Sequence, residues 1–146
     1  MLRQFGARIT NYFIVLAVCL SLMLMACGKE IEKSQTIIRN GVVYQRSETK
    51  PFTGYVTGLD RRGYGQGNFR FKKQYEDGIL NGTSKYWYPN GKLESVVPYE
   101  DGRINGNIVR YYNNGKMKAR IPIKNGVRGG NGSELFWDEN GNIIKG

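Results

Sequence analysis

Two consecutive stretches of the chain decide its fold: YEDGILNGTSKYWYPNGKLESVVP at residues 75–98 and YEDGRINGNIVRYYNNGKMKARIP at residues 99–122. Each stretch opens with Tyr-Glu-Asp-Gly, continues with Asn-Gly and an aromatic pair, and then reaches a second Asn-Gly followed by Lys. The frame repeats after 24 residues. A fixed period of this length predicts a tandem repeat, in which each unit contacts mainly its neighbours.

The frame extends in both directions from this pair. Downstream, Ile123-Lys124-Asn125-Gly126 opens another unit, which carries a two-residue insertion near Gly129 to Gly132 before Phe136-Trp137. Upstream, a degenerate unit begins at Pro51 and has an enlarged turn from Arg61 to Gly67. We therefore predict a repeat domain over residues 37–146, with units at about 51–74, 75–98, 99–122 and 123–146.

The turns and the residues between them predict strands. Asn-Gly occurs eight times and Asp-Gly twice, and both pairs are strong signals of a two-residue hairpin turn with positive φ at both positions. Between turns the apolar residues alternate with polar ones: Leu93, Ser95, Val97 and Tyr99 fall on one side, and Met117, Ala119, Ile121 and Ile123 repeat them. The predicted fold is all-β, an antiparallel meander of repeated β-hairpins after an N-terminal signal helix.

The N-terminal residues have the layout of a secretory signal peptide. Arg3 and Arg8 precede an apolar stretch from Tyr12 to Ala26, and no acid occurs in this region. A permanent transmembrane helix is the alternative, but the stretch has fifteen residues, whereas spanning a bilayer takes about 20. We predict that residues 1–26 are a lipoprotein signal peptide.

The end of this segment carries the expected anchor. Leu24-Met25-Ala26-Cys27-Gly28 resembles the lipobox of bacterial lipoproteins, which implies cleavage between Ala26 and Cys27 and acylation of Cys27. The alternative is a chance thiol. Cys19 would leave with the signal, so the mature chain would hold no disulfide. Gly28 in place of Asp resembles the pattern that directs lipoproteins to an outer membrane, or otherwise to the outer face of the cytoplasmic membrane.

Two short segments join the anchor to the repeats. Residues 27–36 are polar and are expected to form a tether. Ile37 to Gln45, divided by Asn40-Gly41, is expected to form an introductory hairpin.

The charge of the chain favours anionic partners. The 22 basic and 12 acidic residues leave residues 27–146 with twenty basic and twelve acidic groups, a formal charge of +8. In an envelope such partners are lipid head groups, wall polymers or an acidic protein. Nucleic acid is not expected outside the cytoplasm.

The repeat unit itself resembles a known family. Its pattern of Tyr-Glu-Asp-Gly, Asn-Gly, aromatic pair and Asn-Gly-Lys is similar to the bacterial variant of the MORN repeat (membrane occupation and recognition nexus), found in YwqK-family antitoxins. The opening at Arg39 to Tyr44 and Lys50 to Gly54 is similar to the start of such domains. The resemblance covers about residues 37–146 and implies a hairpin-repeat binding module, with an antitoxin or immunity role in some relatives.

The residue types argue against catalysis. The chain has no histidine, its mature part keeps one cysteine, and it lacks a Gly-rich phosphate loop followed by Lys-Ser/Thr. The acid pairs at Glu76-Asp77, Glu100-Asp101 and Asp138-Glu139 recur at turns, where Asp is favoured for backbone reasons. We predict no catalytic, cofactor-binding or metal-binding residues. An enzyme acting on envelope glycans is the least favoured hypothesis.

Two sets of side chains are candidates for a binding surface. The aromatic residues serve either to pack neighbouring hairpins or to form an exposed strip, for which Tyr86, Tyr88 and Tyr112 are the candidates. The basic residues either keep the sheet soluble or contact an anionic surface; the candidates are Arg110, Lys116, Lys118 and Arg120. The leading hypothesis is a lipid-anchored envelope protein that binds a protein partner, such as a toxin. The alternative is a structural protein whose basic sheet contacts anionic lipid or wall polymer.

Overall fold

The computed structural model describes residues 28–61, 68–129 and 133–144, and in these ranges the chain is almost entirely β-structure. The predicted all-β meander of hairpins is confirmed. The predicted signal segment 1–26, its cleavage site at Ala26 and Cys27, and most of the enlarged Arg61–Gly67 turn and the Gly129–Gly132 insertion lie outside the described residues.

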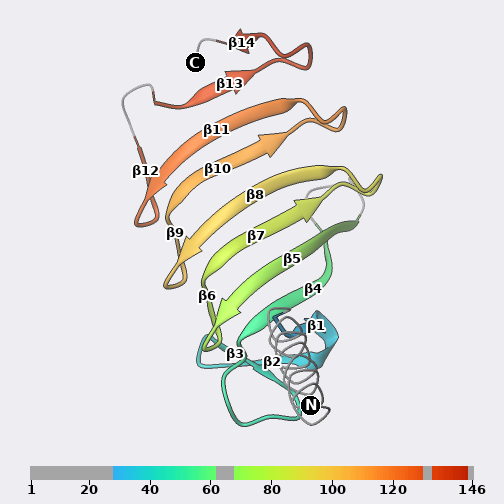
Figure 1. Cartoon of the computed structure of the whole chain (residues 1–146), viewed down its shortest axis with the longest axis vertical. Helices are drawn as coiled ribbons and strands as arrows, with labels where there is room; N and C mark the ends of the chain where they lie inside the picture. Colours follow the sequence, from blue (N-terminus) through green and yellow to red (C-terminus); the bar gives the residue numbers. More distant parts are fainter. Residues whose placement is uncertain (1–27, 62–67, 130–132, 145–146) are drawn as a thin grey trace, which may run out of the picture.

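Most strands form one long sheet in which the order in space follows the order in sequence (Figure 1). The described path is β1-β4-β5-β7-β8-β10-β11-β13-β14, with short strands β6, β9 and β12 at one margin and a separate β2–β3 hairpin. The elements are β1 (Glu30–Glu32), 3-10 helix η1 (Lys33–Gln35), β2 (Thr36–Arg39), β3 (Val42–Gln45), β4 (Gly54–Arg61), β5 (Asn68–Glu76), β6 (Ile79–Leu80), β7 (Gly82–Trp87), β8 (Leu93–Glu100), β9 (Arg103–Ile104), β10 (Gly106–Tyr111), β11 (Met117–Lys124), β12 (Val127–Arg128), β13 (Leu135–Trp137) and β14 (Ile143–Ile144).

The 24-residue period is visible in the strands. The pairs β5/β8, β6/β9 and β7/β10 end 24 residues apart, and β8 and β11 do the same. Backbone hydrogen bonds recur in the same way: Gly102 N–H donates to Leu80 O and Gly126 N–H donates to Ile104 O, both at 2.8 Å. Each unit is therefore bonded to the turn of the next one.

Within the described residues, the Asn-Gly and Asp-Gly pairs occupy three different settings. Asn40-Gly41, Asp77-Gly78, Asp101-Gly102 and Asn125-Gly126 have positive φ at both residues, as a two-residue hairpin turn requires. At Asn90-Gly91, Asn114-Gly115 and Asn140-Gly141 the described positive φ is confined to the glycine, and the asparagine is the third residue of a five-residue loop. In two of these loops the Asn Oδ1 accepts the backbone N–H two residues later, in Lys92 and Lys116.

At two further places an Asn-Gly pair does not form a hairpin turn. Asn81-Gly82 and Asn105-Gly106 join β6 to β7 and β9 to β10, where the chain kinks within the returning half of a hairpin. Glycine is needed there because of close approach as well as positive φ: a Cβ on Gly106 would lie 2.9 Å from Pro98 Cγ. The kink inserts extra residues and shifts the register, as a β-bulge does.

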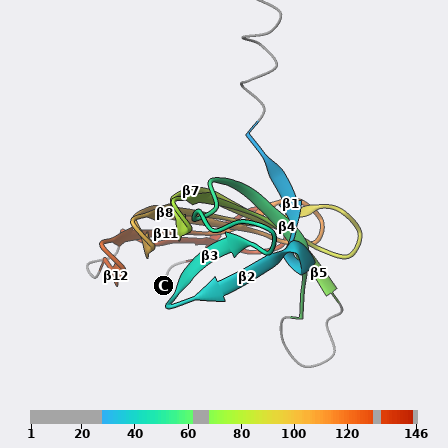
Figure 2. The same ribbon diagram turned by 90° about the horizontal axis from the view of Figure 1, so that it is seen from below.

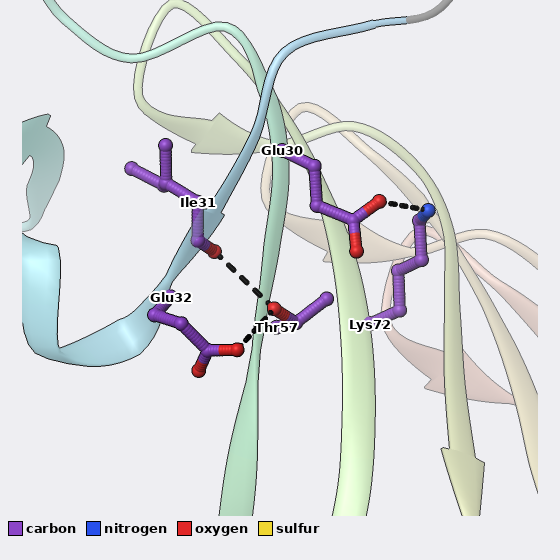
Figure 3. Close-up of polar contacts among 5 residues, drawn as sticks. All are labelled: Glu30, Ile31, Glu32, Thr57 and Lys72. Carbon is purple, nitrogen blue, oxygen red and sulfur yellow. Dashed lines mark hydrogen bonds and ion pairs between the residues drawn. The ribbon is translucent and has the colours of Figure 1, made fainter.

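The expected tether does not remain separate from the domain. Glu30–Glu32 forms β1, which pairs in parallel with β4, and Tyr55 N–H donates to Lys29 O at 2.7 Å. Figure 3 shows its side chains: Glu30 pairs with Lys72 at 2.5 Å, while the Thr57 hydroxyl lies against Ile31 O and Glu32. Ile31 is only 7% exposed. The burial of one isoleucine and the pairing of its flanking acids fix this polar segment to the sheet edge.

The introductory hairpin covers one face of the sheet at its N-terminal end. β2 and β3 form the predicted hairpin, which lies on one side of the long sheet (Figure 2). Val43 N–H donates to Gly78 O at 2.9 Å, and Val43 and Phe52 are buried in a cluster with Val56 and Phe71. This cluster is the hydrophobic core of the described domain.

Candidate binding faces

The register divides the side chains of the long sheet between two faces. The apolar face, which the β2–β3 hairpin partly covers, carries the residues Val56, Phe69, Phe71, Tyr86, Ser95, Val97, Ile108, Arg110, Ala119, Ile121 and Phe136. The basic face carries the residues Tyr55, Thr57, Arg70, Lys72, Lys85, Trp87, Val96, Lys118 and Arg120. The predicted division into a buried and a wet side is thus confirmed for β5, β8 and β11.

From Tyr86 to Ala119 the apolar face is packed by alternating large and small side chains. Phe71 pairs with Tyr86, Tyr86 with Ser95, Ser95 with Arg110, and Arg110 with Ala119. Small residues leave room for the long side chains on the neighbouring strands. The side chains in the middle of this face can therefore be buried although only one sheet carries them. Tyr86 is 4% exposed, and its ring lies near that of Phe71 with centroids 6.5 Å apart.

The apolar face becomes more exposed beyond β8. Ile108 and Ile121, which pair across β10 and β11, and Phe136 on β13 are half-buried, and Ile144 on β14 is 47% exposed. The β2–β3 hairpin lies at the opposite end of the sheet (Figure 1). We call Ile108, Ile121, Phe136 and Ile144 the open apolar segment. It is continuous with the covered core of the first units, because Ile108 packs against that core.

The loops at one margin of the sheet carry a ladder of contacts between units. The Tyr88 hydroxyl donates to Tyr111 O, and the Tyr112 hydroxyl donates to Trp137 O, each at 2.7 Å. Lys116 Nζ donates to Asn140 O at 2.9 Å. Burial raises the pKa of Tyr88, and Glu94 adds to the effect, so the hydroxyl keeps the proton that it donates.

Of the seven residues predicted to form one binding surface, Lys118 and Tyr112 are in contact, with Lys118 Nζ 5.1 Å from the ring centre, but the seven do not form a single surface. Tyr86 is buried on the apolar face, where Arg110 is exposed, while Lys118 and Arg120 project from the basic face. The remaining three, Tyr88, Tyr112 and Lys116, join neighbouring units in the loop ladder. The idea of an exposed strip containing Tyr86 is therefore wrong, because the large-and-small packing of the apolar face encloses that ring.

The basic face holds a cavity that the sequence did not indicate. It has a volume of about 580 Å³ and lies over β4, β5 and β7, and Gly28 and Glu30 also line it. Tyr55, Lys72, Lys85 and Trp87 line it. Lys72 and Lys85 are direct cross-strand partners, and their separation of 13 residues in sequence becomes a contact only through the β5–β7 register.

Two negative findings concern the described residues alone. Within residues 28–61, 68–129 and 133–144, no group of three or more His, Cys, Asp or Glu side chains is placed to hold a metal ion. The same ranges contain no helix of sufficient length and hydrophobicity to cross a membrane.

These features define a tandem β-hairpin repeat protein with one long curved sheet and a separate β2–β3 hairpin. The family model described as MORN repeat variant matches residues 80–101 and 104–125, so these two units are similar to MORN-variant repeats. Each match begins in the second strand of one hairpin and ends at the turn of the next. No curated protein and no solved structure matches the chain.

Proposed function

We propose that this chain is a non-enzymatic, lipid-anchored envelope protein that binds a protein partner, in an antitoxin or immunity role. The observation that carries the proposal is the open apolar segment beyond β8. Its half-buried residues Ile108, Ile121 and Phe136 continue a surface that the β2–β3 hairpin covers in the first units. Apolar side chains left uncovered on a sheet face in this way are typical of a protein interaction site.

Charge complementarity favours a partner with acidic residues around an apolar centre. Arg110 lies exposed among the apolar side chains, and residues 27–146 have a formal charge of +8. Like-charged partners are disfavoured at such a surface, and acidic ones associate faster. The MORN-variant repeats support a binding module, since repeat sheets present extended surfaces to partners.

A toxin challenge tests the antitoxin role. Cells that lack the protein should die when a toxin encoded beside it is produced, and the wild-type chain should rescue them. The double variant Ile108→Lys/Ile121→Lys should lose rescue, whereas Lys118→Gln/Arg120→Gln on the other face should retain it. Equal survival of cells with and without the protein would contradict the role. A thermal melt of each variant separates lost binding from lost folding.

Fatty-acid labelling tests the anchor. Labelling should disappear in Cys27→Ser and persist in Cys19→Ser, the matched change at the other cysteine. Unchanged labelling of Cys27→Ser would contradict lipid anchoring. The expected location is the outer membrane of a cell that has one, or else the outer face of the cytoplasmic membrane.

A second candidate function is a structural envelope protein whose sheet contacts anionic lipid or wall polymer. It is favoured by the grouping of five cations on the basic face: Arg70, Lys72, Lys85, Lys118 and Arg120. The Cys27→Ser protein should then bind anionic vesicles or wall polymer at low salt and release them as ionic strength rises. Absence of binding to either at low salt would exclude this candidate.

A further inference from the structure

The basic-face cavity contains a charge arrangement that the protein's own groups leave incompletely neutralised. Lys72 and Lys85 are directly opposite each other in β5 and β7. Like charges in this position destabilise a strand pair unless a counter-charge is near. Glu30 pairs with Lys72, whose Nζ also lies 4.4 Å from the centre of the Tyr55 ring. Lys85 is exposed, and within the described ranges its ammonium group makes no hydrogen bond or ion pair.

Neutral groups and ring surfaces surround these cations. Gln74 Oε1 accepts the Thr83 backbone N–H at 3.3 Å, and both residues line the cavity, to which they contribute an amide and a hydroxyl group. Arg70 lies over the Trp87 ring at 5.6 Å but does not line the cavity. The indole therefore offers the cavity a surface that Arg70 does not occupy.

The size of the cavity helps to identify the ligand class. A lone phosphate or carboxylate would fill a small part of about 580 Å³, whereas pockets for small organic ligands measure roughly 300 to 1,000 Å³. The cations require an anionic group, the amide and hydroxyl suit sugar hydroxyls, and the rings provide apolar walls. The phosphate of a lipid head group would contact the cations but would leave the amide, the hydroxyl and the rings without a partner.

We propose that this cavity binds an acidic sugar unit, carboxylated or phosphorylated, of an envelope glycan. Lys85 and Lys72 hold the anionic group, Gln74 and Thr83 bond to hydroxyls, and Tyr55 and Trp87 flank the ring. The proposal deepens the second candidate function by naming its ligand. It is independent of the toxin challenge, because that test probes the apolar face.

The test uses Trp87 as a reporter in the full-length chain. Trp137→Phe leaves Trp87 as the sole tryptophan, and the protein is reconstituted in phosphatidylcholine nanodiscs. It is titrated with a hyaluronan tetrasaccharide, which carries uronates, and with chitotetraose, its neutral counterpart. We expect saturable fluorescence change with the acidic sugar and about tenfold weaker binding of the neutral one, equivalent to about 1.4 kcal/mol.

Matched lysine variants identify the site. Lys85→Gln should weaken binding of the hyaluronan tetrasaccharide about tenfold, while Lys118→Gln, on the same face outside the cavity, should leave it unchanged. Equal effects of the two variants, or no binding of the acidic sugar, would overturn the proposal. The proposal would also be overturned if Trp87 fluorescence did not respond to the sugar but changed, in a Lys85-dependent way, when phosphatidylglycerol replaced phosphatidylcholine. That result would indicate that the cavity binds the bilayer.

Discussion

The Tyr88 hydroxyl donates a hydrogen bond of 2.7 Å to the backbone carbonyl of Tyr111, which lies in the following unit. Tyr112 repeats this bond one unit later, to Trp137. Because each bond joins neighbouring units, the loop ladder couples their stabilities, as nearest-neighbour contacts do in repeat proteins.

Tyr88→Phe should therefore destabilise the domain while retaining the ring. Loss of one hydrogen bond predicts a decrease of about 1 kcal/mol in the free energy of unfolding, measured by urea denaturation. Tyr111→Phe is the matched control, since the Tyr111 hydroxyl makes no hydrogen bond within the described part of the chain. Equal losses in the two variants would show that the Tyr88 bond contributes nothing specific.

Tyr86→Ala should be far more damaging than a change at its exposed neighbour on the same face. Tyr86 is 4% exposed, and truncation of a buried aromatic residue costs roughly 3 to 5 kcal/mol. Arg110→Ala should change stability by about 0.5 kcal/mol or less, because the residue is exposed. Denaturant titration of both variants measures the difference, and a stable Tyr86→Ala protein would argue against the enclosed packing.

Much of this arrangement follows from sequence. The 24-residue frame, the four turns with positive φ at both residues and the alternation in β8 and β11 are local patterns, and the structure confirms them. The position of Tyr86 does not follow from local pattern, since its burial depends on the hairpin that folds over the first units and on small residues such as Ser95 in the next strand. Alternation predicts which side chains share a face, but it does not predict what covers that face.

The Lys72–Lys85 pair and strand β1 could not be predicted from the sequence. The Lys72–Lys85 pair depends on the kink at Asn81-Gly82, which adds residues between β5 and β7 and cannot be counted from turn pairs alone. β1 has three residues and one buried apolar side chain, Ile31, which is too short a pattern to distinguish a strand from a polar tether.

Gly54→Ala should detach β1 from the sheet. Gly54 has φ of 143°, and a Cβ at this position would overlap the Lys29 carbonyl oxygen that accepts the Tyr55 N–H. Gly115 has φ of 93° and open space around it, so Gly115→Ala tests backbone strain alone. We expect a loss of about 1 to 2 kcal/mol for Gly115→Ala and a larger loss for Gly54→Ala.

Hydrogen exchange of the Tyr55 amide distinguishes the two glycine variants. This amide should lose protection in Gly54→Ala and retain it in Gly115→Ala, because only the former breaks its bond to Lys29. Retained protection in Gly54→Ala would mean that β1 accommodates the added methyl group without leaving the sheet edge.

The last described loop should open in acid because of Asp138. The Asn142 side chain, followed by backbone N–H donors that include those of Asn142 and Asn140, lowers the pKa of the Asp138 carboxyl. A lowered folded-state pKa means that the stabilisation is complete above the unfolded value of about 3.9 and is lost as the pH falls through the folded value.

The Asn142 amide should therefore exchange faster, relative to its intrinsic rate, as acid is added. Asp138→Asn should abolish this pH dependence, whereas Glu139→Gln should preserve it; a profile unchanged in Asp138→Asn would assign the acid sensitivity to another group.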